Sequence, residues 1–131
     1  MTRTIFLSGK QAVKLANIDD CISAVKSGFR QRGKGAPVLP RQKLSSESPP
    51  GDLIGQMTIL PESNAMGGMI VSLGFSTEDA WFLIALFDAE TGEPCCLIDG
   101  TSINALKTGA VGGVGIDVLA RQDASSVAII G

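Results

Sequence analysis

The sequence of 131 residues contains no histidine and no tyrosine, and it has a single tryptophan. Without histidine, these residues cannot form a Ser-His-Asp or Cys-His triad or a His-ligated zinc site. Any proton transfer by the chain's own side chains must therefore use Asp, Glu or Lys. The absence of histidine thus excludes the commonest hydrolytic and metal-dependent mechanisms from this region.

Charge and long apolar runs are also scarce. Charged residues make up 18% of the chain and the formal net charge is −2, which excludes the basic surface expected of a protein that binds nucleic acid or anionic membranes. No apolar run reaches the length of a membrane span, and the residues Met1–Ile5 lack the apolar core of a secretory signal. We therefore expect a cytoplasmic protein without a nucleic-acid or membrane partner.

Cysteine is limited to Cys21, Cys95 and Cys96, an odd number that includes an adjacent pair. We interpret all three as reduced, small core residues, and we expect no metal site. The hydrophobic fraction of 44% is that of a globular chain with a core of its own.

The pattern of apolar residues predicts an α/β domain, α+β-like, in which helices pack on a mixed sheet. A strand over 80–87 is almost wholly apolar and is expected to be buried on both faces. The segment 45–51 predicts a turn or flexible loop, and Thr101 or Ser102 is expected to cap the last helix. The remaining predicted elements are strands over 4–7, 52–60, 66–75 and 95–98 and helices over 9–16, 18–33 and 103–118.

Glycine is concentrated in two places. Gly67 and Gly68 interrupt a predicted strand, which suggests a close backbone approach or a bulge. The last helix contains Gly109, Gly112, Gly113 and Gly115, and each glycine in a helix interior costs about 1 kcal/mol relative to alanine. We expect close packing of another backbone or a ligand along that helix.

The final residues, Ser125–Gly131, form a short β-branched run that ends in glycine. Two interpretations are open from these residues alone. One is a buried terminal strand that closes an ordinary α/β domain. The other is the first strand of a dinucleotide-binding unit, whose further glycines and helix would follow.

Three segments resemble the ornithine cyclodeaminase/mu-crystallin family: Leu86–Pro94, Asp99–Ala110 and Leu119–Gly131. The resemblance implies the N-terminal domain of that fold, truncated at the first strand of its Rossmann domain. Residues 1–124 would form a substrate-binding and dimerisation domain, and 125–131 the first strand of the dinucleotide-binding domain. It further implies a homodimer formed through the sheet, a small amino or imino acid as ligand, and NAD or NADP as cofactor. We expect the chain alone to bind no cofactor.

The resemblance also implies roles for particular residues. Arg41, which by itself is interpreted as a solvated loop cation, matches an arginine that binds the substrate carboxylate. Lys107 stands where the family has arginine, so it keeps the charge but loses the planar fork. Met69 stands where the family has a lysine, so one cation of the substrate site is missing.

Two further positions match cofactor contacts of the family. Thr108 matches the threonine that reaches the cofactor phosphates, and the alternative is a helical threonine bonded to its own backbone. Gly131 matches the first glycine of the cofactor fingerprint. Asp88, Glu90 and Glu93 cluster in a predicted hairpin and are interpreted as solvated turn residues rather than catalytic acids.

Two functions follow from these observations. The first is the front part of an NAD(P)-dependent cyclodeaminase, imino-acid reductase or amino-acid dehydrogenase, which is inactive as this chain alone. The second is a non-catalytic, free-standing module for dimerisation or small-ligand binding that lacks the cofactor domain. Arg41, Lys107 and Thr108 favour the first, whereas Met69 favours the second.

Overall fold

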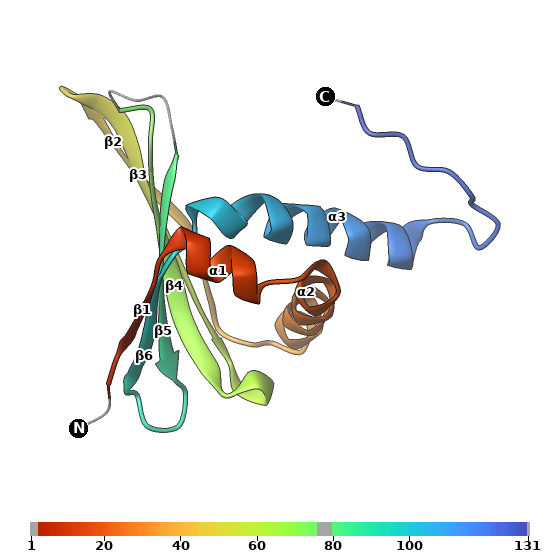
Figure 1. The fold of residues 1–131 in the computed structure, drawn as a ribbon, viewed down its shortest axis with the longest axis horizontal. Helices are drawn as coiled ribbons and strands as arrows, with labels where there is room; N and C mark the ends of the chain where they lie inside the picture. Colours follow the sequence, from red (N-terminus) through yellow and green to blue (C-terminus); the bar gives the residue numbers. More distant parts are fainter. Residues whose placement is uncertain (1–2, 76–79, 131) are drawn as a thin grey trace.

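The computed structural model describes residues 3–75 and 80–130, in which three α-helices lie on one side of a six-stranded sheet (Figure 1). The strand order is β1-β6-β5-β4-β3-β2; β1 is parallel to β6 and the other neighbours are antiparallel. The predicted mixed-sheet α/β fold is confirmed. The elements are β1 (Ile5–Leu7), α1 (Gly9–Leu15), α2 (Ile18–Gly33), β2 (Val38–Glu47), β3 (Pro50–Leu60), η1 (Pro61–Ser63), β4 (Ala65–Leu73), β5 (Trp81–Asp88), β6 (Pro94–Asp99), η2 (Thr101–Ile103) and α3 (Asn104–Leu119).

The first two helices begin at polar residues that satisfy the free amides of a helix start. The Ser8 amide donates to the Gln11 side chain at 3.0 Å, and the Asn17 side chain accepts from the Asp20 amide at 2.9 Å. Helix α2 ends before Gly35, whose φ of 94° lies in the left-handed region that favours glycine. The predicted positions of both helices are confirmed.

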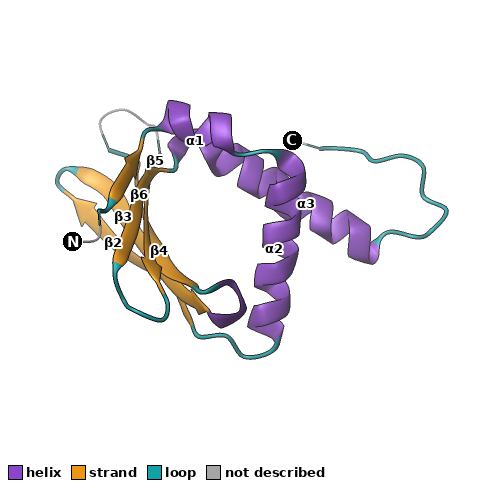
Figure 2. Cartoon of the chain, turned by 60° about the horizontal axis from the view of Figure 1, so that its bottom comes forward, coloured by secondary structure: helices purple, strands orange, loops and turns teal. Residues whose placement is uncertain are grey.

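The two faces of the sheet differ in what covers them. Side chains alternate between the faces of a strand, and Ile54 and Val71, which are 7% and 2% exposed, lie on the face beneath the helices. Figure 2 shows α1, α2 and α3 all on that side. The helices add few buried apolar side chains, namely Ala12 on α1 and Ala110 and Val114 on α3. The core of the described residues is therefore small and lies on one side of the sheet.

The opposite side, which we call the bare face, carries large apolar side chains that no described element covers. The prediction that β5 is buried on both faces is wrong, because Trp81 and Leu83 are 53% and 44% exposed there. β5 is apolar from Trp81 to Phe87 on both faces, but the described residues cover only one of them. The bare face consists of Phe6, Leu39, Leu44, Leu53, Met57, Ile59, Ile70, Trp81, Leu83 and Leu97.

The turn predicted over 45–51 is present but shorter than expected, because β2 and β3 continue as a hairpin that turns only at residues 48 and 49. Cross-strand polar contacts favour the extended pairing. Asp52 accepts a hydrogen bond from the Ser45 hydroxyl at 2.7 Å and pairs with Lys43 at 3.3 Å. Pro, Gly and Ser thus occupy the strand ends as well as the turn.

The start and the glycines of α3 differ from expectation. Thr101 begins the 3-10 turn η2, and its hydroxyl accepts from the Phe82 amide at 3.1 Å instead of capping α3. Of the four glycines, only Gly113 lies against a neighbour, Ile22 of α2, at a distance ordinary for packing. A Cβ added at Gly109, Gly112 or Gly115 would meet no atom within 4 Å. Among the described residues, close packing therefore does not explain these three.

The terminal segment does not form the predicted strand. The described part, residues 125–130, has no regular secondary structure, and Ile129 and Ile130 are 93% and 97% exposed. A strand needs a hydrogen-bonding neighbour, and the six-stranded sheet supplies none here. The assignment of 125–131 to a dinucleotide-binding domain stays a prediction.

Asp88 organises the turn between β5 and β6 and generates a pH-dependent prediction. Its carboxylate accepts from the Thr91 amide at 2.7 Å, the Thr91 hydroxyl at 3.0 Å and the Glu90 amide at 2.9 Å. These bonds, the one from the Thr91 amide foremost, hold the pKa of Asp88 below its ordinary value of 3.8. The stabilisation is therefore fully present above that value and is lost as the pH falls through the lower, folded-state pKa.

We expect Asp88→Asn to flatten the loss of unfolding free energy on acidification from about pH 5 to pH 2. The asparagine oxygen can still accept hydrogen bonds but carries no charge that titrates. Urea denaturation at several pH values measures the effect. Asp123→Asn, which alters an exposed ion pair with Arg121, should leave the acid dependence unchanged; equal slopes for wild type and Asp88→Asn would contradict the account.

Candidate functional site

A cavity of about 690 Å³ lies between the covered face of the sheet and helices α2 and α3. Its walls are mostly apolar, with Gln56 and Thr58 as uncharged polar groups. Cavities of this size and character are typical sites for small ligands. The apolar walls include Val25, Phe29, Val38, Pro40, Leu60, Ala65, Met69, Ile84, Leu86 and Val111.

Two glycines of β4 line this cavity, and each brings backbones close together. A Cβ at Gly67 would collide with the carbonyl oxygen of Ala85, and one at Gly68 would lie 2.8 Å from the carbonyl oxygen of Gln56. The predicted close approach is confirmed. The bulges lie elsewhere, between Leu39 and Gln42 and between Leu86 and Phe87.

The charged residues that line the cavity are all cations: Arg32 from α2, Arg41 from β2 and Lys107 from α3. The register shift between Leu39 and Gln42 puts Arg41 in a β-bulge, a distortion that redirects side chains. No Asp or Glu of the described residues is among the lining residues. The arrangement suits an anion, because a cleft lined by charge of one sign attracts its counter-ion.

These three cations are exposed and, like several other cations of the described residues, have no acidic partner. Lys26, Lys34, Lys43 and Arg121 each form an ion pair within the described residues, and none of the four lines the cavity. No ion pair is formed by Arg32, Arg41 or Lys107 among the residues that the structure describes. Their positive charge is therefore available to a ligand.

The structure brings together three of the residues singled out from the sequence, Arg41, Met69 and Lys107, at one cavity. Their roles in binding stay predictions. Arg32 was missed, because it belongs to none of the segments that carry the family resemblance. The signal was present, since Arg32 follows Val25 and Phe29 at the spacing of one helix face.

The predicted cofactor residues lie apart from this group. Thr108 is exposed on α3 and does not line the cavity. Because α3 begins at Asn104, the Thr108 amide belongs to the helical hydrogen-bonding pattern. Only its hydroxyl, which makes no hydrogen bond among the described residues, is free to reach a phosphate. Gly131 lies outside the described residues.

Gln31, the neighbour of Arg32, fastens the end of α2 to the turn between β3 and β4. Gln31 is buried, with only 2% of its surface exposed. The Gln31 amide group donates to the Ser63 hydroxyl at 2.9 Å, and its oxygen accepts from the Glu62 amide at 3.1 Å. An ion pair of 2.7 Å between Lys34 and Glu62 spans the same junction, and Lys34 holds the pKa of Glu62 below its ordinary value. This clamp fixes the part of α2 that carries Arg32.

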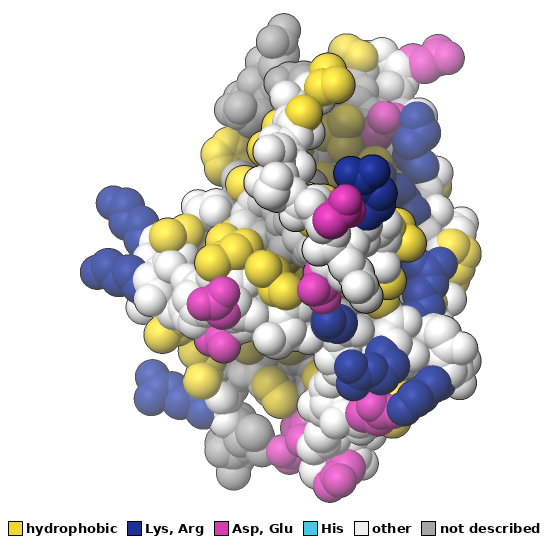
Figure 3. All heavy atoms as spheres, turned by 90° about the vertical axis from the view of Figure 1, so that its right-hand side faces the viewer, with side chains coloured by type: hydrophobic (Ala, Val, Ile, Leu, Met, Phe, Trp, Pro, Cys, Tyr) yellow, Lys and Arg dark blue, Asp and Glu magenta, His cyan; other side chains and the backbone are white. Residues whose placement is uncertain are grey.

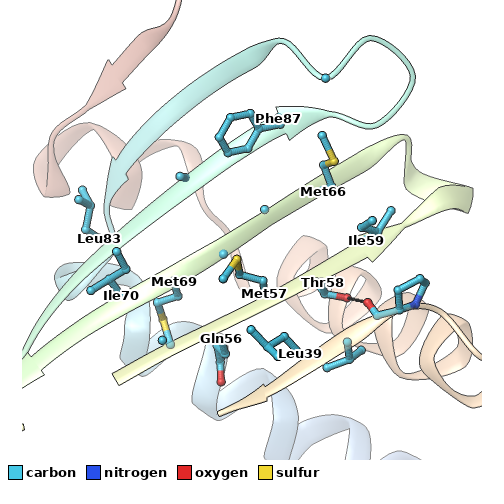
Figure 4. Close-up of a pocket in the computed structure, with 17 residues that line it drawn as sticks. Leu39, Gln56, Met57, Thr58, Ile59, Met66, Met69, Ile70, Leu83 and Phe87 are labelled. Atoms are coloured by element: carbon cyan, nitrogen blue, oxygen red, sulfur yellow. Dashed lines mark hydrogen bonds between the residues drawn. The ribbon is translucent and has the colours of Figure 1, made fainter. Parts of the chain in front are cut away.

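A second hollow of about 780 Å³ lies on the bare face, and Figure 4 shows its lining side chains. Its labelled residues include Met57, Met66, Ile70, Leu83 and Phe87, and none of its described lining residues is charged. The Thr58 hydroxyl donates to the carbonyl oxygen of Pro37 at 3.0 Å, so it can meet a ligand only as an acceptor. The bare face is therefore apolar, in contrast to the cationic cavity on the helix side.

The described residues give no support to a metal site or to a helix that crosses a membrane. Residues 3–75 and 80–130 contain no group of three or more Cys, Asp or Glu side chains placed to hold a metal ion. None of the described helices combines the length and hydrophobicity needed to cross a bilayer. On the side shown in Figure 3, acidic and basic side chains are interspersed. No broad field of one sign covers that side.

Comparison with known proteins adds independent information. The sequence pattern of the "Ornithine cyclodeaminase/mu-crystallin family" matches residues 2–131. Alanine dehydrogenase of Archaeoglobus fulgidus is 28% identical over 134 residues, which cover 98% of this chain and 40% of that protein. The chain therefore spans about two fifths of the length of this relative.

Solved structures agree with this match. Thermococcus litoralis Δ1-pyrroline-2-carboxylate reductase, in complex with NADH and L-proline, superposes with a TM-score of 0.82 and 31% identity over 92% of this chain and 39% of that one. An archaeal alanine dehydrogenase dimer with bound NAD gives a TM-score of 0.80 and 30% identity over 92% of this chain and 38% of that one. The fold described above is thus shared with both proteins.

We expect Gln31→Ala to lower the free energy of unfolding by about 1–3 kcal/mol, because buried groups lose their hydrogen-bond partners. Urea denaturation measures this loss. Gln42→Ala is the matched control, since Gln42 is exposed and bonds only to the Pro40 carbonyl of its own strand at 3.3 Å. Its effect should stay within about 0.5 kcal/mol. Similar small effects of both variants would show that the clamp contributes little.

Proposed function

This chain belongs to the ornithine cyclodeaminase/mu-crystallin family, and we propose that it is the N-terminal, substrate-binding part of an NAD(P)-dependent cyclodeaminase-like, imino-acid reductase-like or amino-acid dehydrogenase-like protein. The observation that carries this proposal is the cavity between sheet and helices, whose charged lining residues are all cations without acidic partners. The relatives compared above act on or bind small amino or imino acids, each of which has a carboxylate.

Arg41 is the proposed main contact of that carboxylate. A guanidinium offers two parallel donors to a carboxylate, and such charge-assisted pairs are about twice as strong as neutral hydrogen bonds. Lys107 contributes a second positive charge but no fork. Met69 contributes an apolar surface where the family has a lysine. The ligand is therefore held from β2 and α3 against the floor of β4.

The proposed cofactor is NAD or NADP, which supplies the hydride donor or acceptor when it is bound. Among the described residues, only the Thr108 hydroxyl fits a predicted phosphate contact. Gly131 would be the first glycine of the dinucleotide-binding loop. The chain's own contribution is to bind and orient the small ligand, and we expect these 131 residues alone to bind no dinucleotide.

The bare face is the proposed surface for a second copy of this chain. Its apolar side chains extend across most of the sheet, and exposed apolar patches of that extent mark protein interfaces. The archaeal alanine dehydrogenase compared above is a dimer. Pairing through the bare face leaves the cationic cavity, on the other side of the sheet, open to its ligand.

The proposed location is the cytoplasm. Cys21, Cys95 and Cys96 are free thiols in this structure, and free thiols are typical of reducing compartments.

The alternative is a non-catalytic module that dimerises or binds a small ligand without a cofactor domain. The specific observation in its favour is Met69, which leaves the cavity without the cation that the family uses there. A titration with NADH separates the two functions in a natural chain that continues beyond residue 131. The enzyme proposal predicts binding of NADH by that chain, whereas the alternative predicts none.

We expect Arg41→Gln to weaken the binding of L-proline by roughly tenfold or more, the effect of one charge-assisted pair. Arg41→Lys should lie between wild type and Arg41→Gln, because it keeps the charge without the fork. Isothermal titration calorimetry on the 131-residue chain measures both effects.

Lys43→Gln is the matched control for this experiment. Lys43 lies on the same strand, pairs with Asp52 at 3.3 Å and does not line the cavity. Its substitution should change the affinity for L-proline less than twofold, a shift of about 0.4 kcal/mol. Equal losses for Arg41→Gln and Lys43→Gln would refute a specific carboxylate site at Arg41.

A further inference from the structure

The cavity holds more positive charge than one carboxylate can offset. We infer that the ligand of this site carries a second anionic group, which Arg32 binds, so that the preferred class is a dicarboxylic amino or imino acid rather than a diamino acid. This inference rests on the proposed function and adds to it the class of ligand and the residue that selects it.

The first step of the argument is the charge balance of the cavity. Arg32, Arg41 and Lys107 place three positive charges around a volume of about 690 Å³ with largely apolar walls. No acidic side chain of the described residues lines it, and none of the three cations forms an ion pair with a described residue. A ligand with one carboxylate offsets one of these exposed charges, whereas a second carboxylate offsets another.

The second step is the position of Arg32. It is the cationic lining residue supplied by α2, whereas Arg41 and Lys107 come from β2 and α3. The buried Gln31 beside it fixes this part of α2 to the turn before β4. Arg32 is therefore carried by a clamped helix end rather than by a loose loop, which favours selective recognition.

The third step concerns the ligands that the cavity excludes. A diamino acid brings a second ammonium group, which needs a carboxylate or several carbonyl oxygens as partners. The uncharged polar side chains at hand are Gln56 and Thr58, and neither carries the negative charge that would balance this ammonium. An added ammonium would therefore face like charges without compensation.

The test compares L-glutamate with L-glutamine, two ligands of nearly equal shape that differ in the second carboxylate. Calorimetry on the 131-residue chain at pH 7 should show L-glutamate binding roughly tenfold more tightly than L-glutamine, as expected for one additional charge-assisted pair. L-ornithine should bind no more tightly than L-glutamine. Arg32→Gln should remove the preference and leave the affinity for L-glutamine within about twofold.

Arg30→Gln is the matched control, because Arg30 is exposed on the same helix end and does not line the cavity. It removes the same charge and should preserve the preference for L-glutamate. Circular dichroism confirms that the variants are folded. A preference that survives Arg32→Gln, or one that Arg30→Gln removes equally, would overturn the inference.

Two further results distinguish this inference from the proposed function. If Arg41→Gln weakens both ligands while Arg32→Gln leaves their ratio unchanged, the carboxylate site stands and the dicarboxylate inference fails. If Arg41→Gln affects neither ligand, the proposed function fails as well. Inorganic pyrophosphate serves as a third probe: if Arg32→Gln weakens pyrophosphate but leaves the glutamate preference intact, Arg32 contacts a cofactor phosphate, and the inference is overturned.

Discussion

The structure depends on the alternation of side chains between the two faces of one antiparallel sheet. Strands β4 and β5 carry apolar side chains on both faces, but the described helices cover only one face. The apolar side chains on the other face of these two strands therefore have no cover among the described residues. Burial of apolar surface contributes about 25 cal/mol per Å² to stability. An uncovered sheet face therefore lacks this favourable contribution to the free energy of folding. A second copy is the proposed cover.

The covered face is itself only partly filled. Few side chains are fully buried there, and α2 reaches the sheet chiefly through the clamp that joins Gln31 to Ser63 and Glu62. A cavity results where a larger core would close the space. The cations of α2, β2 and α3 line that cavity, so the same loose packing that limits the core creates the candidate site. The small core and the candidate site thus have one structural origin.

Much of the fold follows from the sequence, because long apolar periodicities fix α2, β4, β5 and β6 to within a few residues. Local composition misled the prediction at residues 45–51, where Asp52 pairs with Ser45 and Lys43 across the strands. Propensity describes single residues, whereas a cross-strand contact joins residues that the sequence separates. The unpaired terminal segment is the converse case, since its apolar run has strand character but no neighbour.

The site was predictable only in part, for a similar reason. Arg41, Met69 and Lys107 were found through resemblance to a family, and the structure places them at one cavity. Arg32 has no counterpart in the motifs quoted, and only the packing of α2 over the sheet brings it there. The bare face could not be predicted from the sequence of β5 either. An apolar strand has the same sequence pattern whether its second face contacts a helix or another molecule.

The most direct test of the division between the two faces uses Trp81, the single tryptophan, which is 53% exposed on the bare face. Acrylamide quenching of its fluorescence is compared in wild type and in Ile70→Asp, which places a charge on the same face. The account predicts that Trp81 is shielded in wild type and accessible in the variant, and that L-glutamate changes neither. Equal quenching in both chains would contradict the claim that a second copy covers this face.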